Sequence, residues 1–528
     1  MDFENQSVVP GLVKSLPEIS VDKLTYTYTL RDDVFWDDKS PLHSEDIVFT
    51  AKAFKCPLTN NQSVRVYWKN IKDIITYTDN PKKFTIVMKQ ANIQNVSFLT
   101  GFSILQRTFH DKKNVLSNYS FNQINDSLFT PKGDLVEWAR EFNQDKYGRD
   151  PLFLNGLGMY NVTEWATGQY ITITRKTDHW SFQSIDYREV SFPEKIIFLL
   201  NSDETSQLFK FKSQEIDVST NLSMPAFLKL KSDEAFISNY NQELMPTFNY
   251  TYVCFNTKPE EKKRNPIFND VDVRLAFAML TPVDEIIHFQ YKQFAPQCRR
   301  MVSNVSTLKK EFNNQLKPLP FNVSKAELLL KKAGWKDTDN DGILDKTIEG
   351  RQISLVADLN YIASSSDWKE IALLIAESMA KAGIKIKTVG MDIKLFLEKA
   401  KSHDFDLMLG SWGGTGLPED YSQLWHTQSW TNHGSNYSGF GNQQTDSLID
   451  AINLSKTDSI RFLLSGKLQQ EIYNVQPYVF LYSTMRRNVI HKRFGNQLIF
   501  SERPGVLVNM LRLLSINKGI TMVDEQSP

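Results

Sequence analysis

The chain has 528 residues, of which 41% are hydrophobic and 23% are charged, so it is long enough for two or three globular domains with their own cores. Lysine plus arginine and aspartate plus glutamate both number 61, and the resulting net charge of zero excludes a basic field for nucleic acid or an anionic membrane. No apolar run approaches the roughly 18 residues that span a bilayer, and three cysteines, Cys56, Cys254 and Cys298, allow one disulfide or buried free thiols.

The first informative pattern lies at residues 23–49. A half-buried strand is predicted where apolar residues alternate with polar ones, at Leu24, Tyr26, Tyr28 and Leu30. After a polar turn, Ser44 predicts the start of a helix, because serine caps helices and because Glu45 and Asp46 follow at the positive end of the helix dipole. We therefore expect a strand, a turn and a capped helix in immediate succession.

Strand and helix patterns continue through the rest of the chain. Runs rich in β-branched and aromatic residues predict strands at 170–175, 194–200 and 250–255. Apolar residues at helical spacing predict helices over 365–382 and 459–474. Gly383 stands where a glycine commonly ends a helix, directly before the strand-like segment IKIKTV. Helical and strand patterns both occur without internal repeats, which indicates an α/β protein with a mixed sheet.

These patterns carry a resemblance to a known family. Residues 23–49 match its strand–turn–helix signature at Leu24, Thr25, Tyr26, Leu30, Arg31, Asp32, Val34, Asp37, Pro41, Leu42, Glu45, Asp46, Val48 and Phe49. Later landmarks follow in the family's order: GLGMYNVTEWATGQ from Gly156, SQEID from Ser213, NPIFNDVDVRLAFAMLTPVDEII from Asn265, KAELLLKKAGW from Lys325 and HDFDLMLGSWGG from His403. The chain thus resembles the family 5 extracellular solute-binding proteins of bacterial ABC importers, which include dipeptide- and oligopeptide-binding proteins.

The resemblance implies a two-lobed periplasmic-binding-protein-like fold of class II, in its large three-domain form, with mixed sheets and a hinge. The small subdomain of the N-terminal lobe would comprise residues 1–155, the large part of that lobe residues 156–258 and 488–528, and the second lobe residues 259–487. Ligand would bind in the cleft between the lobes, as hinged binding proteins close around their ligands.

The start of the chain differs from that of a typical family member. Met1 is followed by no basic segment, apolar core or small-residue cleavage site, so the sequence shown contains no export signal. The resemblance nevertheless implies an extracytoplasmic protein, either periplasmic or anchored to the membrane as a lipoprotein. It also implies a first strand ahead of Val9, so we expect the large lobe's sheet near residues 171–175 and 194–200 to lack one strand.

The candidate ligand site lies at the end of a predicted strand within DFDLMLGSWGGTG, which starts at Asp404. This strand ends in Ser411, Trp412, Gly413 and Gly414, where missing side chains let another backbone come close. An extended peptide can pair its N–H and C=O groups with such a backbone, as in strand addition, and the indole face of Trp412 can cover a ligand side chain. The alternative is that Trp412 is a core aromatic and the glycines form a tight turn.

The charges of this segment depart from the family pattern. Oligopeptide and dipeptide binders usually carry an aspartate three residues after the tryptophan, which pairs with the peptide's α-amino group, whereas this chain has Thr415. Glu419 or Asp420 would supply the carboxylate instead, because a buried ammonium needs a paired anion. The alternative is that both are solvated loop residues. The predicted ligand-binding residues are Ser411, Trp412, Gly413, Gly414, Thr415, Glu419 and Asp420.

Two other patterns have some features of metal sites. Residues 337–345, DTDNDGILD, match an EF-hand loop up to its ninth position, but Ile348 replaces the bidentate glutamate, which favours a structural turn over a calcium site. His426 and His433 flank Trp430, and we interpret them as surface residues rather than ligands of nickel or haem. The sequence carries no catalytic or nucleotide-binding motif. We therefore expect no enzymatic activity, no cofactor and no metal.

We expect a monomeric protein that captures oligopeptides and delivers them to an ABC permease in the membrane, with no nucleic-acid partner. Ligand would favour a closed hinge state, and about 5.5 kcal/mol of differential affinity would move the closed population from one to ninety-nine per cent. Two alternatives stay open: a related binder of a nickel chelate, haem or a sugar, and a surface protein with a chaperone or adhesion role.

Overall fold

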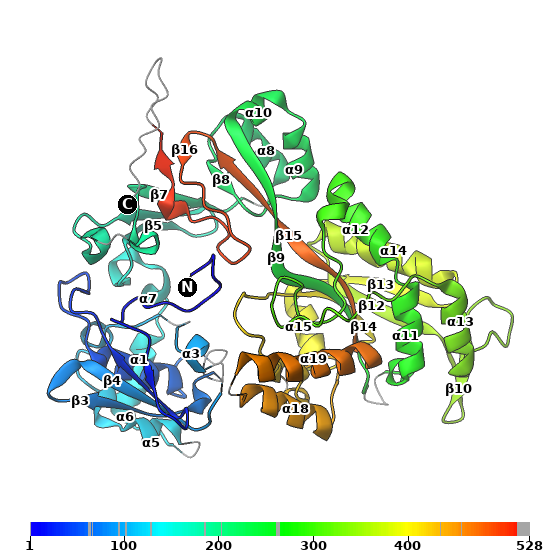
Figure 1. The fold of residues 1–528 in the computed structure, drawn as a ribbon, viewed down its shortest axis with the longest axis horizontal. Coiled ribbons are helices and arrows are strands. Elements are labelled where there is room, and N and C mark those ends of the chain that lie inside the picture. The colour runs from blue at the N-terminus through cyan, green and yellow to red at the C-terminus, as the bar shows by residue number, and fades with distance from the viewer. Residues whose placement is uncertain are drawn as a thin grey trace. The chain divides into compact units, whose positions relative to one another are not determined.

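The computed structural model describes residues 2–61, 65, 67–92, 95–100, 103–126, 129–183, 186–201, 203–259, 264–432, 434–455 and 457–514. The chain divides into two compact units, of which the first comprises residues 1–243, 487–500 and 504–528 and the second residues 244–486 and 501–503. The chain passes from the first unit into the second near residue 243 and returns to the first near residue 486. These two boundaries fall inside the long strands β9 (Tyr240–Phe255) and β15 (Tyr478–His491) (Figure 1). The finer three-part division stays a prediction.

The described residues of the first unit form a four-stranded, a three-stranded and a two-stranded sheet together with several short helices (Figure 1). Its strands are β1 (Glu18–Ile19), β2 (Thr25–Thr29), β3 (Ile71–Tyr77), β4 (Asn80–Met88), β5 (Tyr160–Ala166), β6 (Tyr170–Arg175), β7 (Lys195–Leu199), β8 (Val218–Ser219), β16 (Phe494–Gly495) and β17 (Arg512–Leu513). Its helices are α1 (Ser44–Lys55), α3 (Asn95–Phe98), α4 (Arg107–His110), α5 (Phe121–Asn125), α6 (Gly133–Phe142), α7 (Lys146–Arg149), α8 (Glu204–Lys212), α9 (Met224–Lys231) and α10 (Glu234–Asn239).

The predicted strand, turn and helix at residues 23–49 are confirmed, but the N-cap residue of the helix is His43 and not Ser44. Strand β2 buries Tyr26 and Tyr28 and pairs antiparallel with β4 in a sheet of order β1-β2-β4-β3. Helix α1 begins at Ser44, and the carboxylate of Asp46 accepts the backbone N–H groups of His43 (3.0 Å) and Arg107 (2.8 Å). Burial raises the pKa of Asp46, and these hydrogen bonds oppose the shift. The acidic residue of the signature thus fastens the helix start to a distant segment.

The second sheet of this unit contains two of the predicted strands. Its order is β5-β6-β7, with both pairs antiparallel and with Gly168 (φ +76°) in the turn between β5 and β6. Among the described residues β7 pairs only with β6. The apolar side chains of Ile197, Phe198, Leu199 and Leu200 are all exposed. Strand β7 therefore presents an apolar edge. Natural sheets usually cover such an edge with another segment or place charged side chains on it.

The second unit is built on a mixed sheet. Its strands, besides the long β9 and β15, are β10 (Asp345–Ile348), β11 (Arg351–Ser354), β12 (Val356–Ile362), β13 (Lys385–Met391) and β14 (Leu407–Trp412). Its helices are α11 (Val271–Leu280), α12 (Val283–Tyr291), α13 (Val323–Lys332), α14 (Ser366–Ala380), α15 (Ile393–Lys401), α16 (Ser422–Trp425), α17 (Thr427–Thr431), α18 (Gln443–Asn453) and α19 (Asp458–Val475). The predicted helices correspond to α14 and α19, and Gly383, just past α14, has a φ of +74°.

Strand β14 is an inner strand of this mixed sheet, whose order is β13-β12-β14-β9-β15-β8. It runs parallel to β12 and antiparallel to β9, and β12 is parallel to β13 (Figure 1). Helix α14 packs against β12 and β13, and α18 lies beside α19. Aromatic residues fill much of the core next to β14, including Tyr252, Phe405, Trp425, Tyr478 and Phe480. The predicted α/β fold with mixed sheets is confirmed.

The three cysteines are free thiols: Cys56 and Cys254 are buried and Cys298 is half-buried. Burial raises the pKa of the Cys298 thiol to about 12, so this group stays protonated at neutral pH. Of the two arrangements that the sequence allows, the structure has the free thiols. Among the helices of the described residues, none has both the length and the apolar character needed to cross a bilayer.

Candidate ligand-binding site

The end of strand β14 is the place where this part of the chain leaves the core. Residues Leu407 to Gly410 are buried, whereas Ser411 is exposed and Trp412 is half-buried. Strand β9 holds this end in register, because Ser411 lies opposite Thr251 and Trp412 lies opposite Tyr250. The pairing with β9 therefore fixes the backbone of Ser411 and Trp412 at the end of the strand, and their role in ligand binding stays a prediction.

The three glycines at this end differ in what surrounds them. A Cβ atom on Gly410 would lie 2.7 Å from the hydroxyl oxygen of Tyr252, and one on Gly414 would lie 2.5 Å from the carbonyl oxygen of Phe248. Both positions therefore need glycine for internal packing. A Cβ on Gly413 would meet no atom closer than 3.8 Å. Gly413 is thus the position where an outside backbone can approach without displacing the protein's own atoms.

The loop after Trp412 is held by hydrogen bonds to two other segments of the chain and by one bond within the loop. The N–H of Gly414 donates to Oδ1 of Asn249 (3.0 Å), and the N–H of Gly416 donates to Oε2 of the buried Glu502 (2.6 Å). The hydroxyl of Thr415 accepts the N–H of Leu417 at 3.3 Å, and Thr415 itself is exposed. The predicted residues Ser411 to Thr415 therefore belong to a strand end and a following loop that hydrogen bonds hold in place.

Trp412 has both an internal and an external side. Its ring stacks on Tyr437 with centroids 5.7 Å apart and on Tyr252 with centroids 6.0 Å apart. Its Nε1 donates to the hydroxyl of Tyr478 at 3.4 Å. Because the residue is only partly buried, the indole contributes to the core and still leaves surface for a ligand.

The two acidic residues proposed as amine anchors occupy different settings. The carboxylate of Glu419 lies 2.5 Å from Nζ of Lys309, so it already faces a cation of the protein. Asp420 is exposed, and its Oδ1 accepts the N–H of Ser422 at 2.9 Å. Their role in binding a peptide amine stays a prediction.

A buried ionic network next to this loop was not foreseen from the sequence. Glu311 pairs with Arg461 (2.5 Å), accepts the backbone N–H of Glu419 (2.8 Å) and lies 3.8 Å from Lys309. Burial raises the pKa of Glu311, and the two cations oppose that shift. Since Glu311 and Arg461 are far apart in the chain and neither belongs to a recognisable pattern, no sequence signal pairs them. The network anchors the loop that carries Glu419.

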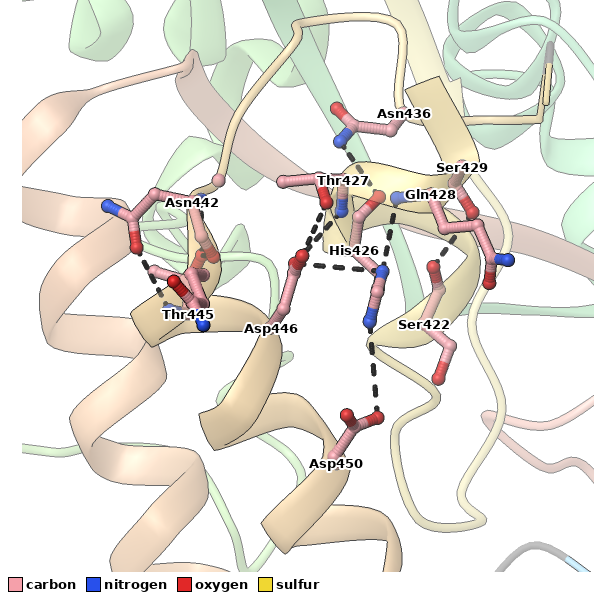
Figure 2. A network of polar contacts seen from close by, with 12 residues as sticks. Ser422, His426, Thr427, Gln428, Ser429, Asn436, Asn442, Thr445, Asp446 and Asp450 are labelled. Atoms are coloured by element: carbon pink, nitrogen blue, oxygen red, sulfur yellow. Dashed lines mark hydrogen bonds and ion pairs between the residues drawn. The ribbon is translucent and has the colours of Figure 1, made fainter. Parts of the chain in front are cut away.

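His426 has a structural role, which Figure 2 shows. Its Nδ1 accepts the N–H of Gln428 at 3.1 Å, so the ring caps the start of α17. Asp446 and Asp450 on α18 lie 3.6 Å and 4.0 Å from the two ring nitrogens, and they join α17 to α18 (Figure 2). His426 is therefore half-buried rather than a surface residue, and His433 lies outside the described residues.

The Asp-rich loop is a turn between α13 and β10. Asp337, Asp339 and Asp345 bring carboxylate oxygens within 4.8 Å of one another. The carboxylate of Asp345, however, accepts the N–H and the hydroxyl of Thr338 at 2.9 and 2.7 Å, and Asp337 accepts the N–H of Gly342. The twelfth position falls in strand β10 rather than in a helix. The segment is thus a hydrogen-bonded turn followed by a strand, and the expectation that it binds no calcium stays a prediction.

The chain has an α/β fold of two compact units, and the strand β14 of its mixed sheet ends at the half-buried Trp412. Residues 7–435 match the sequence pattern of the bacterial extracellular solute-binding proteins, family 5, middle region, and the chain belongs to this family.

Individual relatives share both sequence and fold with the chain. It is 26% identical over 494 residues to the oligopeptide-binding protein AppA of Bacillus subtilis, covering 91% of this chain and 79% of that protein. The structure of AppA from Bacillus subtilis in complex with a nonapeptide superposes with a TM-score of 0.73 at 19% identity, covering 96% and 90% of the two chains. NikA from Brucella suis in complex with Fe(III)-EDTA also gives 0.73 at 19% identity, with 96% and 92% covered.

Proposed function

We propose that this protein captures oligopeptides outside the cytoplasm, as a monomer in the periplasm or anchored to the membrane, and delivers them to an ABC permease. The observation that carries the proposal is the room at Gly413, where a Cβ atom would make only ordinary contacts with Asn249 (3.8 Å) and Arg503 (3.9 Å), whereas Gly410 and Gly414 are closely covered by the protein itself. An extended peptide binds such a place through its backbone, which gives affinity without demanding particular side chains.

The platform comprises Ser411, Trp412, Gly413, Gly414 and Thr415. The exposed part of Trp412 covers a ligand side chain, while Ser411, whose hydroxyl donates to the carbonyl of Tyr250 (3.0 Å), retains acceptor capacity toward a ligand N–H. Glu419 and Asp420 are second-choice contacts, because the first already faces Lys309 and the second is exposed to solvent. The related sequence of the oligopeptide-binding protein AppA supports peptide as the ligand class.

A second candidate ligand is a metal chelate, which the similar fold of NikA with bound Fe(III)-EDTA favours. A thermal-shift screen of di- to pentapeptides against nickel chelates, haem and oligosaccharides separates the candidates. A ligand that binds only the native state stabilises it by about 2.7 kcal/mol at a concentration one hundred times its Kd. We expect peptides to raise the Tm, and a rise with a chelate, haem or sugar but with no peptide would contradict the proposal.

A further inference from the structure

The strand end at Trp412 has an arginine beside its open glycine. Arg503 belongs to the short segment 501–503 of the second unit, and its Nη2 lies 3.9 Å from the position that a Cβ atom on Gly413 would take. Arg503 is exposed, and among the described residues its guanidinium forms no ion pair. A cation thus stands at the place where the platform is open.

The acidic groups around this place have internal partners. Glu502 is buried, and its carboxylate accepts the N–H groups of Gly416 (2.6 Å) and Arg503 (3.2 Å). Glu419 pairs with Lys309 at 2.5 Å. None of these carboxylates forms an ion pair with the Arg503 guanidinium in the described structure.

A second guanidinium adds to the positive charge. Arg486 donates to the backbone carbonyl of Glu502 at 2.8 Å. Burial lowers the pKa of Arg486, and the charge of Arg503 lowers it further, whereas Glu502 opposes the shift. Arg486 therefore lies close enough to Arg503 and Glu502 for their charges to act on it, and Thr415, the exposed polar residue of the loop, is neutral. This end of the platform has an excess of positive charge.

We propose that Arg503 binds a carboxylate of the ligand, so that the anionic end of a peptide, or an acidic side chain, lies at Gly413. The guanidinium fork matches a carboxylate with two parallel hydrogen bonds, and such charge-assisted bonds strengthen when the ligand excludes water. The inference rests on the proposed peptide-binding function. It assigns the sign of charge that this part of the site selects: the site prefers an anion here and not an amine.

Three pools of randomised tetrapeptides without glutamate test the assignment in thermal-shift titrations. The first pool has a free carboxyl terminus and no aspartate, the second is its C-terminal amide, and the third is an amide with one aspartate. We expect the first pool to bind the unmodified protein about tenfold more tightly than the second, as a charge-assisted hydrogen bond implies. Tighter binding of the third pool than of the second would show that a side-chain carboxylate also serves.

The matched variants are Arg503→Gln and Arg351→Gln, since Arg351 is an exposed arginine of the same unit in the distant hairpin strand β11. Arg503→Gln should abolish the difference between pools, and Arg351→Gln should preserve it. If all three pools bind the unmodified protein equally, Arg503 does not bind a carboxylate of the ligand, although the protein still binds peptides. If no pool binds, both this assignment and the proposed function are overturned.

Discussion

Replacing Arg461 by alanine is expected to lower the free energy of unfolding by about 3 kcal/mol or more, because it leaves the buried Glu311 without its closest cation. The side chains of Arg461 and Glu311 are only 7% and 3% exposed and lie 2.5 Å apart. Breaking a buried ion pair lowers the stability far more than breaking a surface pair, because the remaining charge stays buried away from water without a partner. Urea unfolding of the two proteins measures the difference.

Asp458→Ala is the matched control, because Asp458 contacts the same arginine at 3.0 Å but is 70% exposed. Its loss should cost about 1 kcal/mol or less. The pH dependence provides a second check. A carboxyl whose pKa is raised by folding takes up a proton on folding, so its contribution to stability increases as the pH falls. The deficit of Arg461→Ala should therefore shrink in acid, and a deficit no larger than that of Asp458→Ala at neutral pH would contradict the role of the pair.

Trp412→Ala is expected to weaken peptide binding by about 1 to 3 kcal/mol, since an aromatic at the rim of a site supplies contact area to the ligand. Its stability cost should stay below the roughly 3 to 5 kcal/mol of a fully buried tryptophan, because Trp412 is only half-buried. Titration calorimetry with a peptide found in the screen and thermal unfolding of the ligand-free variant measure both quantities on one protein.

Trp425→Ala offers the comparison, because Trp425 is fully buried in the same aromatic core. We expect that variant to lose more stability than Trp412→Ala and to bind peptide normally in its folded fraction. Should Trp412→Ala instead lose as much stability as Trp425→Ala while its folded fraction keeps full affinity, Trp412 would be a core residue and not part of the platform.

Much of the fold follows from local patterns that the structure confirms. Alternation predicted β2, and the acidic residues of the first turn correctly placed the start of α1, although its N-cap is His43 and not Ser44. The helices α14 and α19 end within two residues of their predicted bounds, because helical spacing is a strong signal over such lengths. Ile348 lies in a strand that follows the Asp-rich turn, as predicted, and the expectation that this turn binds no calcium stays a prediction.

The site was less accessible to sequence reasoning, because its properties depend on what distant segments place beside it. Gly413 and Gly414 look alike in the sequence, yet only Gly414 meets the backbone of Phe248. The sequence predicts Glu419 as an amine anchor or a solvated loop residue, but it does not reveal Lys309, which comes from a segment more than one hundred residues away and lies 2.5 Å from the carboxylate. Arg503 lies beside Gly413 although it is about ninety residues later in the chain, and no local sequence pattern predicts this contact.

The peptide affinity of Gly413→Ala tests the central claim most directly. The added Cβ would meet only Asn249 and Arg503, at ordinary contact distances of 3.8 and 3.9 Å, so the Tm of the ligand-free protein should not change. If the ligand backbone lies against Gly413, the methyl group must push it away, and affinity should fall about tenfold, or about 1.4 kcal/mol. An unchanged affinity in this folded variant would contradict a peptide platform at the end of β14.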